Sequence, residues 1–188
     1  MVLYIHGFGS SGQGAKAKLF REHFKDRGEK FLAPSLSFIP ELAISTLEEI
    51  IEMCKDEEIV LMGSSLGGYY AIYLSQKYNL KTVLINPSIK PYETLKKMVG
   101  ENQSFFNNHF SFHWSEAQVE SLKKFSVKIK DKNNYFLLVS TGDEVLDYRE
   151  AVAKLKGSQM IIHDGSDHGF LEVSKHLDTI DEFLKHSL

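Results

Sequence analysis

The feature that most constrains the fold is an alternation between short, continuously apolar runs and longer segments with helical periodicity. Six apolar runs occur, at residues 2–5, 30–33, 59–62, 82–85, 135–139 and 159–162. Helical patterns occupy residues 16–27, 41–55, 66–77, 144–155 and 171–184. Strands that are apolar on both faces are typical of parallel sheets covered by helices. The sequence therefore predicts a three-layer α/β sandwich with a mostly parallel six-stranded sheet.

Composition and charge exclude several other classes of protein. The chain has 188 residues, of which 43% are hydrophobic and 25% are charged, and its net charge is −3. This length suits a single domain, and the slightly acidic balance argues against a nucleic-acid partner. The single cysteine forms no internal disulfide, and the apolar runs are too short to cross a bilayer. Because the chain does not open with a secretory signal pattern, we expect a cytoplasmic protein with no membrane partner.

The most informative motif is the segment 63–67, Gly-Ser-Ser-Leu-Gly, which lies between an apolar run and a helical pattern. A Gly-x-Ser-x-Gly pattern at a strand-to-helix turn is typical of a strained turn that exposes a nucleophilic serine. Ser65 is the central serine of this pattern, whereas Ser64 lacks the second glycine. The following helix points its free N–H groups at Ser65, so we predict Ser65 as the nucleophile.

An activated serine needs a base and an orienting acid, which should follow it in the order acid, then histidine. Asp143 comes immediately after the run at 135–139, with Glu144 and Asp147 as alternative acids. His168 lies in a glycine-bracketed loop after the last run, whereas its rival His163 adjoins that run. Because parallel strands end at one edge of the sheet, we predict that Asp143 and His168 meet Ser65 there.

The first loop, residues 6–14, permits two interpretations. Its glycines can bring the Phe8 N–H toward Ser65, so that Phe8 and Leu66 form an oxyanion hole while His6 braces the loop. Residues 7–12 also fit the Gly-x-Gly-x-x-Gly pattern of dinucleotide sites. An acidic residue after the second strand is missing, and Gly14 prolongs the loop instead of opening a helix. The oxyanion-hole interpretation is therefore preferred, and no cofactor or metal is expected.

Residues 87–134 interrupt the alternation with nearly fifty positions that contain no convincing strand. They carry two helical patterns, at 92–99 and 115–125, and an aromatic cluster between them. The aromatic cluster comprises Phe105, Phe106, Phe110, Phe112 and Trp114. A long insertion in a compact domain is more often functional than idle. We expect a small helical cap in which Phe110, Phe112 and Trp114 bind substrate; the alternative is that the aromatics only pack the cap.

Several motifs together resemble those of the small bacterial YqiA-type esterases and span nearly the whole chain. The matching motifs are His6-Gly7-Phe8, Ser10-Ser11, Lys16-Ala17, the segment 63–71, Asn86-Pro87, the segment 141–148 and the segment 167–170. This resemblance implies that residues 1–188 form a single α/β-hydrolase domain that lacks the first two strands of the full fold. It also implies a triad of Ser65, Asp143 and His168, with Phe8 and Leu66 as the oxyanion hole, acting on short acyl esters.

The residues therefore predict a serine hydrolase that transfers an acyl group from a small-molecule ester to water. A thioesterase or an amidase with the same triad is one alternative. A non-catalytic binding module that keeps the scaffold is the other, because a fold alone does not define a function.

Overall fold

The structure is a computed structural model that describes residues 1–104 and 110–185. Its centre is a six-stranded sheet with the strand order β2-β1-β3-β4-β7-β8, and all neighbouring strands are parallel. The strands are β1 (Val2–Ile5), β2 (Phe31–Leu32), β3 (Val60–Ser65), β4 (Thr82–Pro87), β7 (Tyr135–Ser140) and β8 (Gln159–His163). This confirms the parallel six-stranded sheet that the apolar runs predict.

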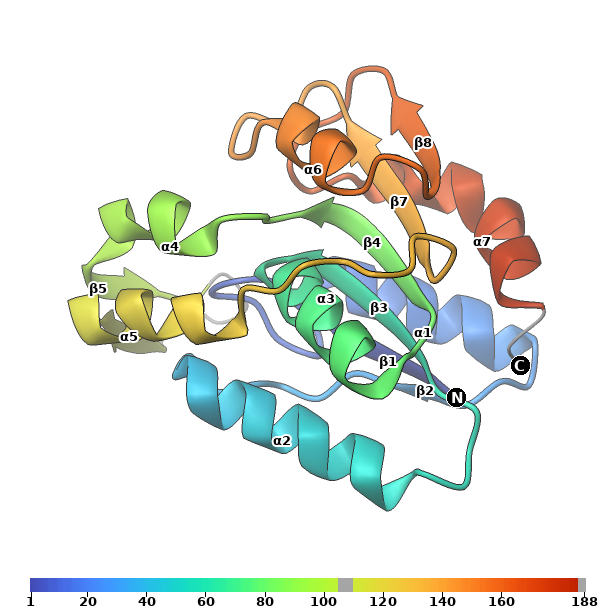
Figure 1. The fold of residues 1–188 in the computed structure, drawn as a ribbon, viewed down its shortest axis with the longest axis horizontal. Helices are drawn as coiled ribbons and strands as arrows, with labels where there is room; N and C mark the ends of the chain where they lie inside the picture. Colours follow the sequence, from blue (N-terminus) through green and yellow to red (C-terminus); the bar gives the residue numbers. More distant parts are fainter. Residues whose placement is uncertain (105–109, 186–188) are drawn as a thin grey trace.

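Helices cover both faces of this sheet (Figure 1). Helix α1 (Ala15–Asp26) and helix α7 (Leu177–Leu184), which follows the 3₁₀ helix η3 (Leu171–His176), pack on one face. Helices α2 (Pro40–Met53), α3 (Leu66–Tyr78) and α6 (Tyr148–Lys154) pack on the other. Alternate residues of each strand feed the two cores, so that Leu3 and Ile5 join one and Val2 and Tyr4 join the other. This is the three-layer sandwich expected from the sequence.

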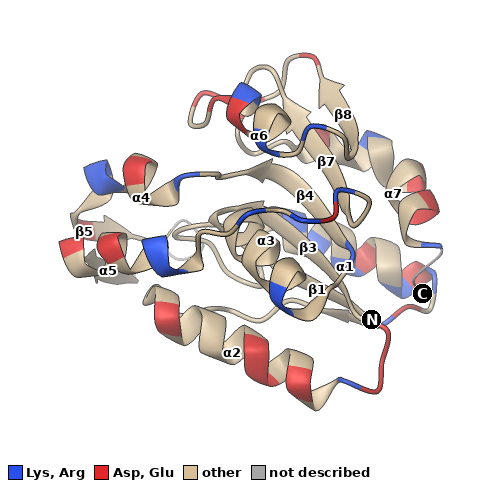
Figure 2. Cartoon of the chain, viewed as in Figure 1, with Lys and Arg blue, Asp and Glu red and all other residues tan. Residues whose placement is uncertain are grey.

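Charged residues lie outside the six-stranded sheet. Figure 2 shows acidic and basic residues interspersed along the helices and loops, while the six strands of the sheet carry none. Among the described helices, none is long and apolar enough to span a bilayer.

After the end of β4, the described residues 88–104 and 110–125 lie beside the carboxyl edge of the sheet, at the left of Figure 1, and the chain then returns to the start of β7. It contains α4 (Pro91–Thr94), η1 (Leu95–Met98), α5 (Glu116–Ser121) and η2 (Leu122–Phe125). It also contains an antiparallel pair, β5 (Gly100–Gln103) and β6 (Ser111–Trp114). The expectation of no strand in this segment is therefore wrong. Strand β5 has no apolar side chain, so nothing in its hydrophobic pattern marks it.

Candidate active site

A sharp turn between β3 and α3 carries Ser65. Strand β3 runs directly into this residue and α3 begins at Leu66, leaving Ser65 at φ 56° and ψ −123°. A positive φ is strained for a residue with a side chain and is often found at functional positions. A Cβ atom on Gly63 would lie 2.5 Å from the carbonyl oxygen of Gly67, and one on Gly67 would collide with the Ile5 carbonyl. Glycine is therefore required at both positions for the turn to close.

A continuous chain of hydrogen bonds joins the predicted serine, histidine and aspartate. Ser65 Oγ lies 3.0 Å from His168 Nε2, and His168 Nδ1 lies 2.8 Å from Asp143 Oδ2. With the imidazole neutral and Nδ1–H donating to the carboxylate, Nε2 is free to accept the hydroxyl proton. Both distances are within the range required for proton transfer. The structure thus brings together three residues that are 103 and 25 positions apart in sequence.

The carboxylate of Asp143 is nearly buried, with 2% of its side chain exposed. Burial by itself raises the pKa of a carboxyl group, but here hydrogen bonds outweigh it. His168 donates to Oδ2, and the backbone N–H groups of Val145 and Leu146 each donate to Oδ1 at 2.9 Å. These bonds hold the pKa of Asp143 below its usual value, so the group is ionised at neutral pH.

The alternative acids and the rival histidine lie elsewhere. Asp147 caps α6 by accepting from the Arg149 N–H at 3.0 Å. Glu144 Oε2 accepts the backbone N–H of His168 at 2.9 Å, so this carboxylate contacts the main chain of His168 and not its ring. His163 ends β8, where its Nδ1 lies 3.1 Å from His176 Nε2. Of these candidates, only Asp143 is hydrogen-bonded to the imidazole ring of His168.

Two further residues tie the His168 loop to the rest of the domain, Asn86 to the sheet and Lys16 to α1, and the sequence analysis assigned neither of them this role. Asn86, buried at the end of β4 with φ 40°, donates to Ser140 Oγ at 3.1 Å and accepts the Ser140 N–H at 2.9 Å. Its amide nitrogen also lies 3.5 Å from the carbonyl oxygen of His168. Lys16 Nζ donates to the Gly169 carbonyl at 2.6 Å. The Asn86-Pro87 and Lys16-Ala17 motifs were the available signals, but they do not specify these contacts.

The first loop lies directly against Ser65. The Ser10 N–H donates to the Gly7 carbonyl at 3.2 Å, so Phe8 is the second residue of a tight turn. The hydrogen bond of this turn does not involve the N–H of Phe8. A Cβ atom on Gly7 would lie 3.0 Å from Ser65 Cβ, which shows how close the loop and the serine are. Leu66 begins α3, where the first N–H groups have no partner within the helix. Both amides proposed for the oxyanion hole thus belong to segments that adjoin Ser65.

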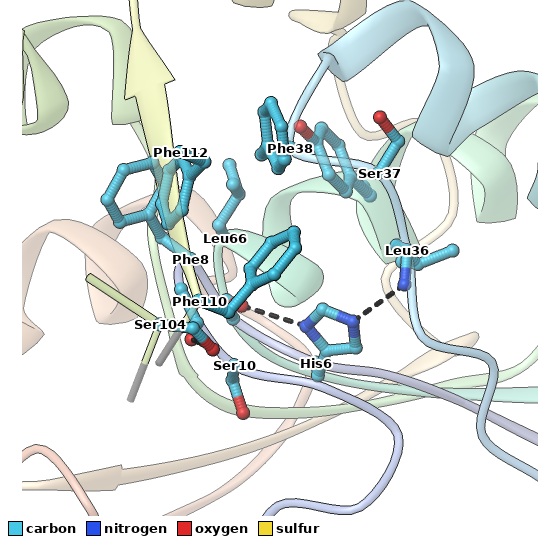
Figure 3. A pocket seen from close by; sticks show the side chains of 13 residues that line it. His6, Phe8, Ser10, Leu36, Ser37, Phe38, Leu66, Ser104, Phe110 and Phe112 are labelled. Atoms are coloured by element: carbon cyan, nitrogen blue, oxygen red, sulfur yellow. Dashed lines mark hydrogen bonds between the residues drawn. The ribbon is translucent and has the colours of Figure 1, made fainter. Parts of the chain in front are cut away.

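His6 braces this loop, as the sequence analysis expects. Its Nδ1 donates to the Gly7 carbonyl at 2.9 Å, and its Nε2 accepts the Leu36 N–H at 2.9 Å (Figure 3). Burial of the ring lowers the pKa of His6 below its ordinary value, which favours the neutral form that these two bonds need. His6 is therefore held as a neutral strut between the first loop and the segment before α2.

Two cavities meet at Ser65 and His168. One, of about 270 Å³, has a mostly apolar wall. Its apolar side chains are Phe8, Leu66, Leu95, Met98, Val145 and Leu146. The other, of about 330 Å³, extends between the first loop and the start of α1 and includes Lys16, Ser10 and Ser11. Ser65 thus lies between an apolar cavity and one that contains the polar side chains Lys16, Ser10 and Ser11, called the polar cavity below.

The aromatic residues predicted to bind substrate do not line either of these cavities. Phe112 is buried, and Phe110 is 54% exposed; both line a third, smaller cavity with Phe8 and Leu66 (Figure 3). Trp114 is fully buried, stacks edge-on against Phe8 at 4.9 Å between ring centroids and donates its Nε1–H to Leu95 O. The placement of Trp114 agrees with the alternative that this aromatic residue only packs the cap. Phe105 and Phe106 lie outside the described residues.

The architecture matches that of the α/β hydrolases. α/β-hydrolase domain-containing protein 10 from mouse superimposes with a TM-score of 0.72 at 20% identity, covering 98% of this chain and 89% of the other. A monoacylglycerol lipase from Paleococcus ferrophilus gives a TM-score of 0.71 at 18% identity, with 99% and 94% covered. At these identities the likeness defines the fold class, which is α/β hydrolase.

The family is defined by sequence. Residues 1–185 match the model described as Uncharacterised protein family (UPF0227), and the chain belongs to this family. One relative, UPF0227 protein PM0825 from Pasteurella multocida, is 26% identical over 188 residues, which cover 97% of this chain and 98% of that protein.

Proposed function

We propose that this protein is a serine esterase that hydrolyses short-chain carboxylic esters through an acyl-enzyme intermediate. The observation that carries the proposal is the unbroken hydrogen-bond chain Ser65–His168–Asp143 at the strained turn after β3. A binding module on the same scaffold has no need for a serine held in a strained conformation against a histidine.

Each residue has a defined role in the proposed reaction. Ser65 Oγ attacks the ester carbonyl carbon while its proton moves to His168 Nε2. The negative oxygen that forms is stabilised by the N–H groups of Phe8 and Leu66. The carbonyl then re-forms, the alcohol leaves with the proton from His168, and the acyl group stays on Ser65. Water repeats the attack with His168 as base, and the carboxylic acid departs. Asp143 orients the ring and stabilises its charged form.

The two cavities suggest how an ester would lie. The apolar cavity suits an acyl chain, because burying methylene groups is favourable by about 0.8 kcal/mol each. Its wall comes partly from η1, through Leu95 and Met98, so we propose that residues 87–134 act as a small cap. The alcohol portion would then occupy the polar cavity, and His168, which lines both cavities, is placed to protonate it.

The test is hydrolysis of p-nitrophenyl esters from acetate to octanoate by the wild type, Ser65→Ala and Ser64→Ala. Ser64 is the matched control, because it is the neighbouring serine and has 3% exposure. We expect Ser65→Ala to lose activity by several orders of magnitude, on the order of 10⁶-fold in kcat if it resembles other triad enzymes. Circular dichroism checks that each variant is folded.

The same assay separates the proposal from its alternatives. Acyl thioesters and anilides tested in parallel show whether a thioester or an amide is the better substrate. Wild-type rates retained in Ser65→Ala, or no hydrolysis of any of these substrates by the wild type, would contradict the proposal.

A further inference from the structure

The polar cavity beside Ser65 is built from the beginning of the chain. Residues of the first loop form one side and the first turn of α1 forms another, with Ser65 and His168 at its inner end. This volume of about 330 Å³ adjoins the reacting atoms but lies outside the apolar compartment assigned to the acyl chain.

Lys16 brings a positive charge into this cavity. Its ammonium group donates to the Gly169 carbonyl at 2.6 Å, which uses one of its three protons and leaves two for a ligand. Burial lowers the pKa of Lys16 to about 8, against the opposing effect of Asp143 and Asp167. The group is therefore charged at neutral pH. Among the residues that line the cavity in the described part of the chain, Lys16 is the only Lys or Arg, and none is Asp or Glu.

The start of α1 adds further positive potential to this cavity. This helix has 12 residues, its N-cap Gly14 has no side chain to cap it, and its first turn contains no acidic residue. The first N–H groups of α1, which have no partner within the helix, and the positive end of its dipole therefore lie at Ala15, Lys16 and Ala17, which line the cavity.

The acidic groups that act on Lys16 are already hydrogen-bonded. Asp143 accepts from His168 and from two backbone amides, and Asp167 Oδ1 accepts the Phe170 N–H at 3.1 Å. Neither carboxylate lines the cavity. A ligand with its own anionic oxygen atoms would therefore meet N–H donors in this cavity. It would contact neither of the two carboxylates.

We propose that Lys16 makes this esterase selective for esters whose alcohol portion carries a negatively charged oxygen group, such as a carboxylate. This inference rests on the proposed function and adds the substrate class. Both cavities include His168, which protonates the departing alcohol. The alcohol side is assigned to the cavity of Lys16 because the wall of the other cavity is mostly apolar and its one Lys or Arg, Lys97, is exposed.

The test compares two butyrate esters of similar shape, one of 4-hydroxybenzoate, which is anionic, and one of 4-hydroxybenzamide, which is neutral. The quantity measured is the ratio of kcat/KM for the anionic ester to that for the neutral ester. A ratio is used because Lys16 also holds the Gly169 carbonyl, and any disturbance of the His168 loop lowers both rates together.

We expect Lys16→Met to reduce this ratio about tenfold, as for loss of a partly buried charge partner, and Lys16→Arg to keep most of it. Lys18→Met is the matched control: Lys18 is exposed on the same helix and should leave the ratio unchanged. An unchanged ratio in Lys16→Met, or an equal fall of both rates, would overturn the proposal in favour of a purely structural lysine.

A second arm uses the wild type alone and so does not depend on a variant folding. The ratio should fall as the pH rises through about 8, because Lys16 loses its charge there. Effects of pH on the groups that act on both esters alike cancel in the ratio. A ratio that stays constant through this range would contradict the proposal. Hydrolysis of both esters without selectivity refutes only the role of Lys16, whereas hydrolysis of neither refutes the esterase itself.

Discussion

The two cavities that meet at Ser65 are built by different parts of the molecule. The apolar one takes its wall from the loop after β7 and from η1 of the segment 87–134. The polar one takes its wall from the first loop and from α1, and it contains Lys16. Both include Phe8, Ser65 and His168, which lie where strands of the sheet end.

The groups proposed to carry out the reaction and the groups proposed to recognise the substrate thus belong to different parts of the fold. The carboxyl edge of the sheet holds the groups that would make and break bonds, and these are fixed by strand ends and by a turn that requires glycine. The first loop with α1 on one side, and η1 with the loop after β7 on the other, determine which side chains contact each half of an ester. Changes at the sheet edge should therefore affect all substrates equally, and changes in a cavity wall should affect only one half of the ester.

The largest effect is expected for Asp143→Asn, at the group shared by both cavities. The amide would favour the wrong tautomer of His168, so kcat should fall about 10⁴-fold for every ester, whatever its acyl chain or alcohol. Asp147→Asn is the control, since Asp147 caps α6 and is exposed. Steady-state kinetics on folded variants measures the effect. Near-normal turnover in Asp143→Asn would transfer the acid role to Glu144 or Asp147.

A smaller and selective effect is expected for Leu95→Ala in the apolar wall. Removing this side chain enlarges the cavity, so the ratio of kcat/KM for the octanoate to that for the butyrate ester should rise about tenfold. Leu171→Ala is the matched control, because Leu171 is half-exposed and lines the polar cavity. An unchanged chain-length profile in Leu95→Ala would show that the acyl group does not enter this cavity.

The smallest effect is expected for stability and concerns His6, which supports the loop common to both cavities. Its pKa in the folded state lies below the ordinary value of about 6.5, so below that pH the unfolded chain binds more protons. The stability that neutral His6 contributes is therefore present at higher pH and is lost as the pH falls through its folded pKa.

His6→Gln should consequently lower Tm most at about pH 7.5, with the gap to the wild type narrowing by roughly 2–4 °C toward pH 5. The exposed His113 provides the control variant His113→Gln. Thermal unfolding followed by circular dichroism measures the gap. A difference in Tm that does not vary with pH would mean that His6 contributes only through packing.

The sequence predicted the sheet well and singled out three residues that the structure brings together, because both depend on local patterns. Continuous apolar runs predicted all six strands of the sheet, and strand β8 was predicted within one residue. Ser65, Asp143 and His168 could be located because a parallel sheet places all its strand ends at one edge. The predicted helix at 144–155 begins later, at Tyr148, because Asp143 and Asp147 hold the preceding residues in turns.

Contacts between distant segments could not be predicted from such patterns. The hydrogen bond from Lys16 to Gly169 joins residues 153 positions apart, and Asn86 bonds to Ser140 across 54 positions. The aromatic cluster was correctly located in the insertion, but composition does not determine which ring faces a cavity. Trp114 packs behind Phe8, while the less conspicuous Leu95 and Met98 line the cavity beside Ser65.

The most direct test of the central claim is covalent labelling with a fluorophosphonate, which reacts only with an activated serine. Intact-mass measurement should show one label per chain in the wild type and in Ser64→Ala, and none in Ser65→Ala. Peptide mapping should place the label on Ser65. A label on another residue, or an unlabelled wild type that is folded, would contradict the assignment of Ser65 as an activated nucleophile.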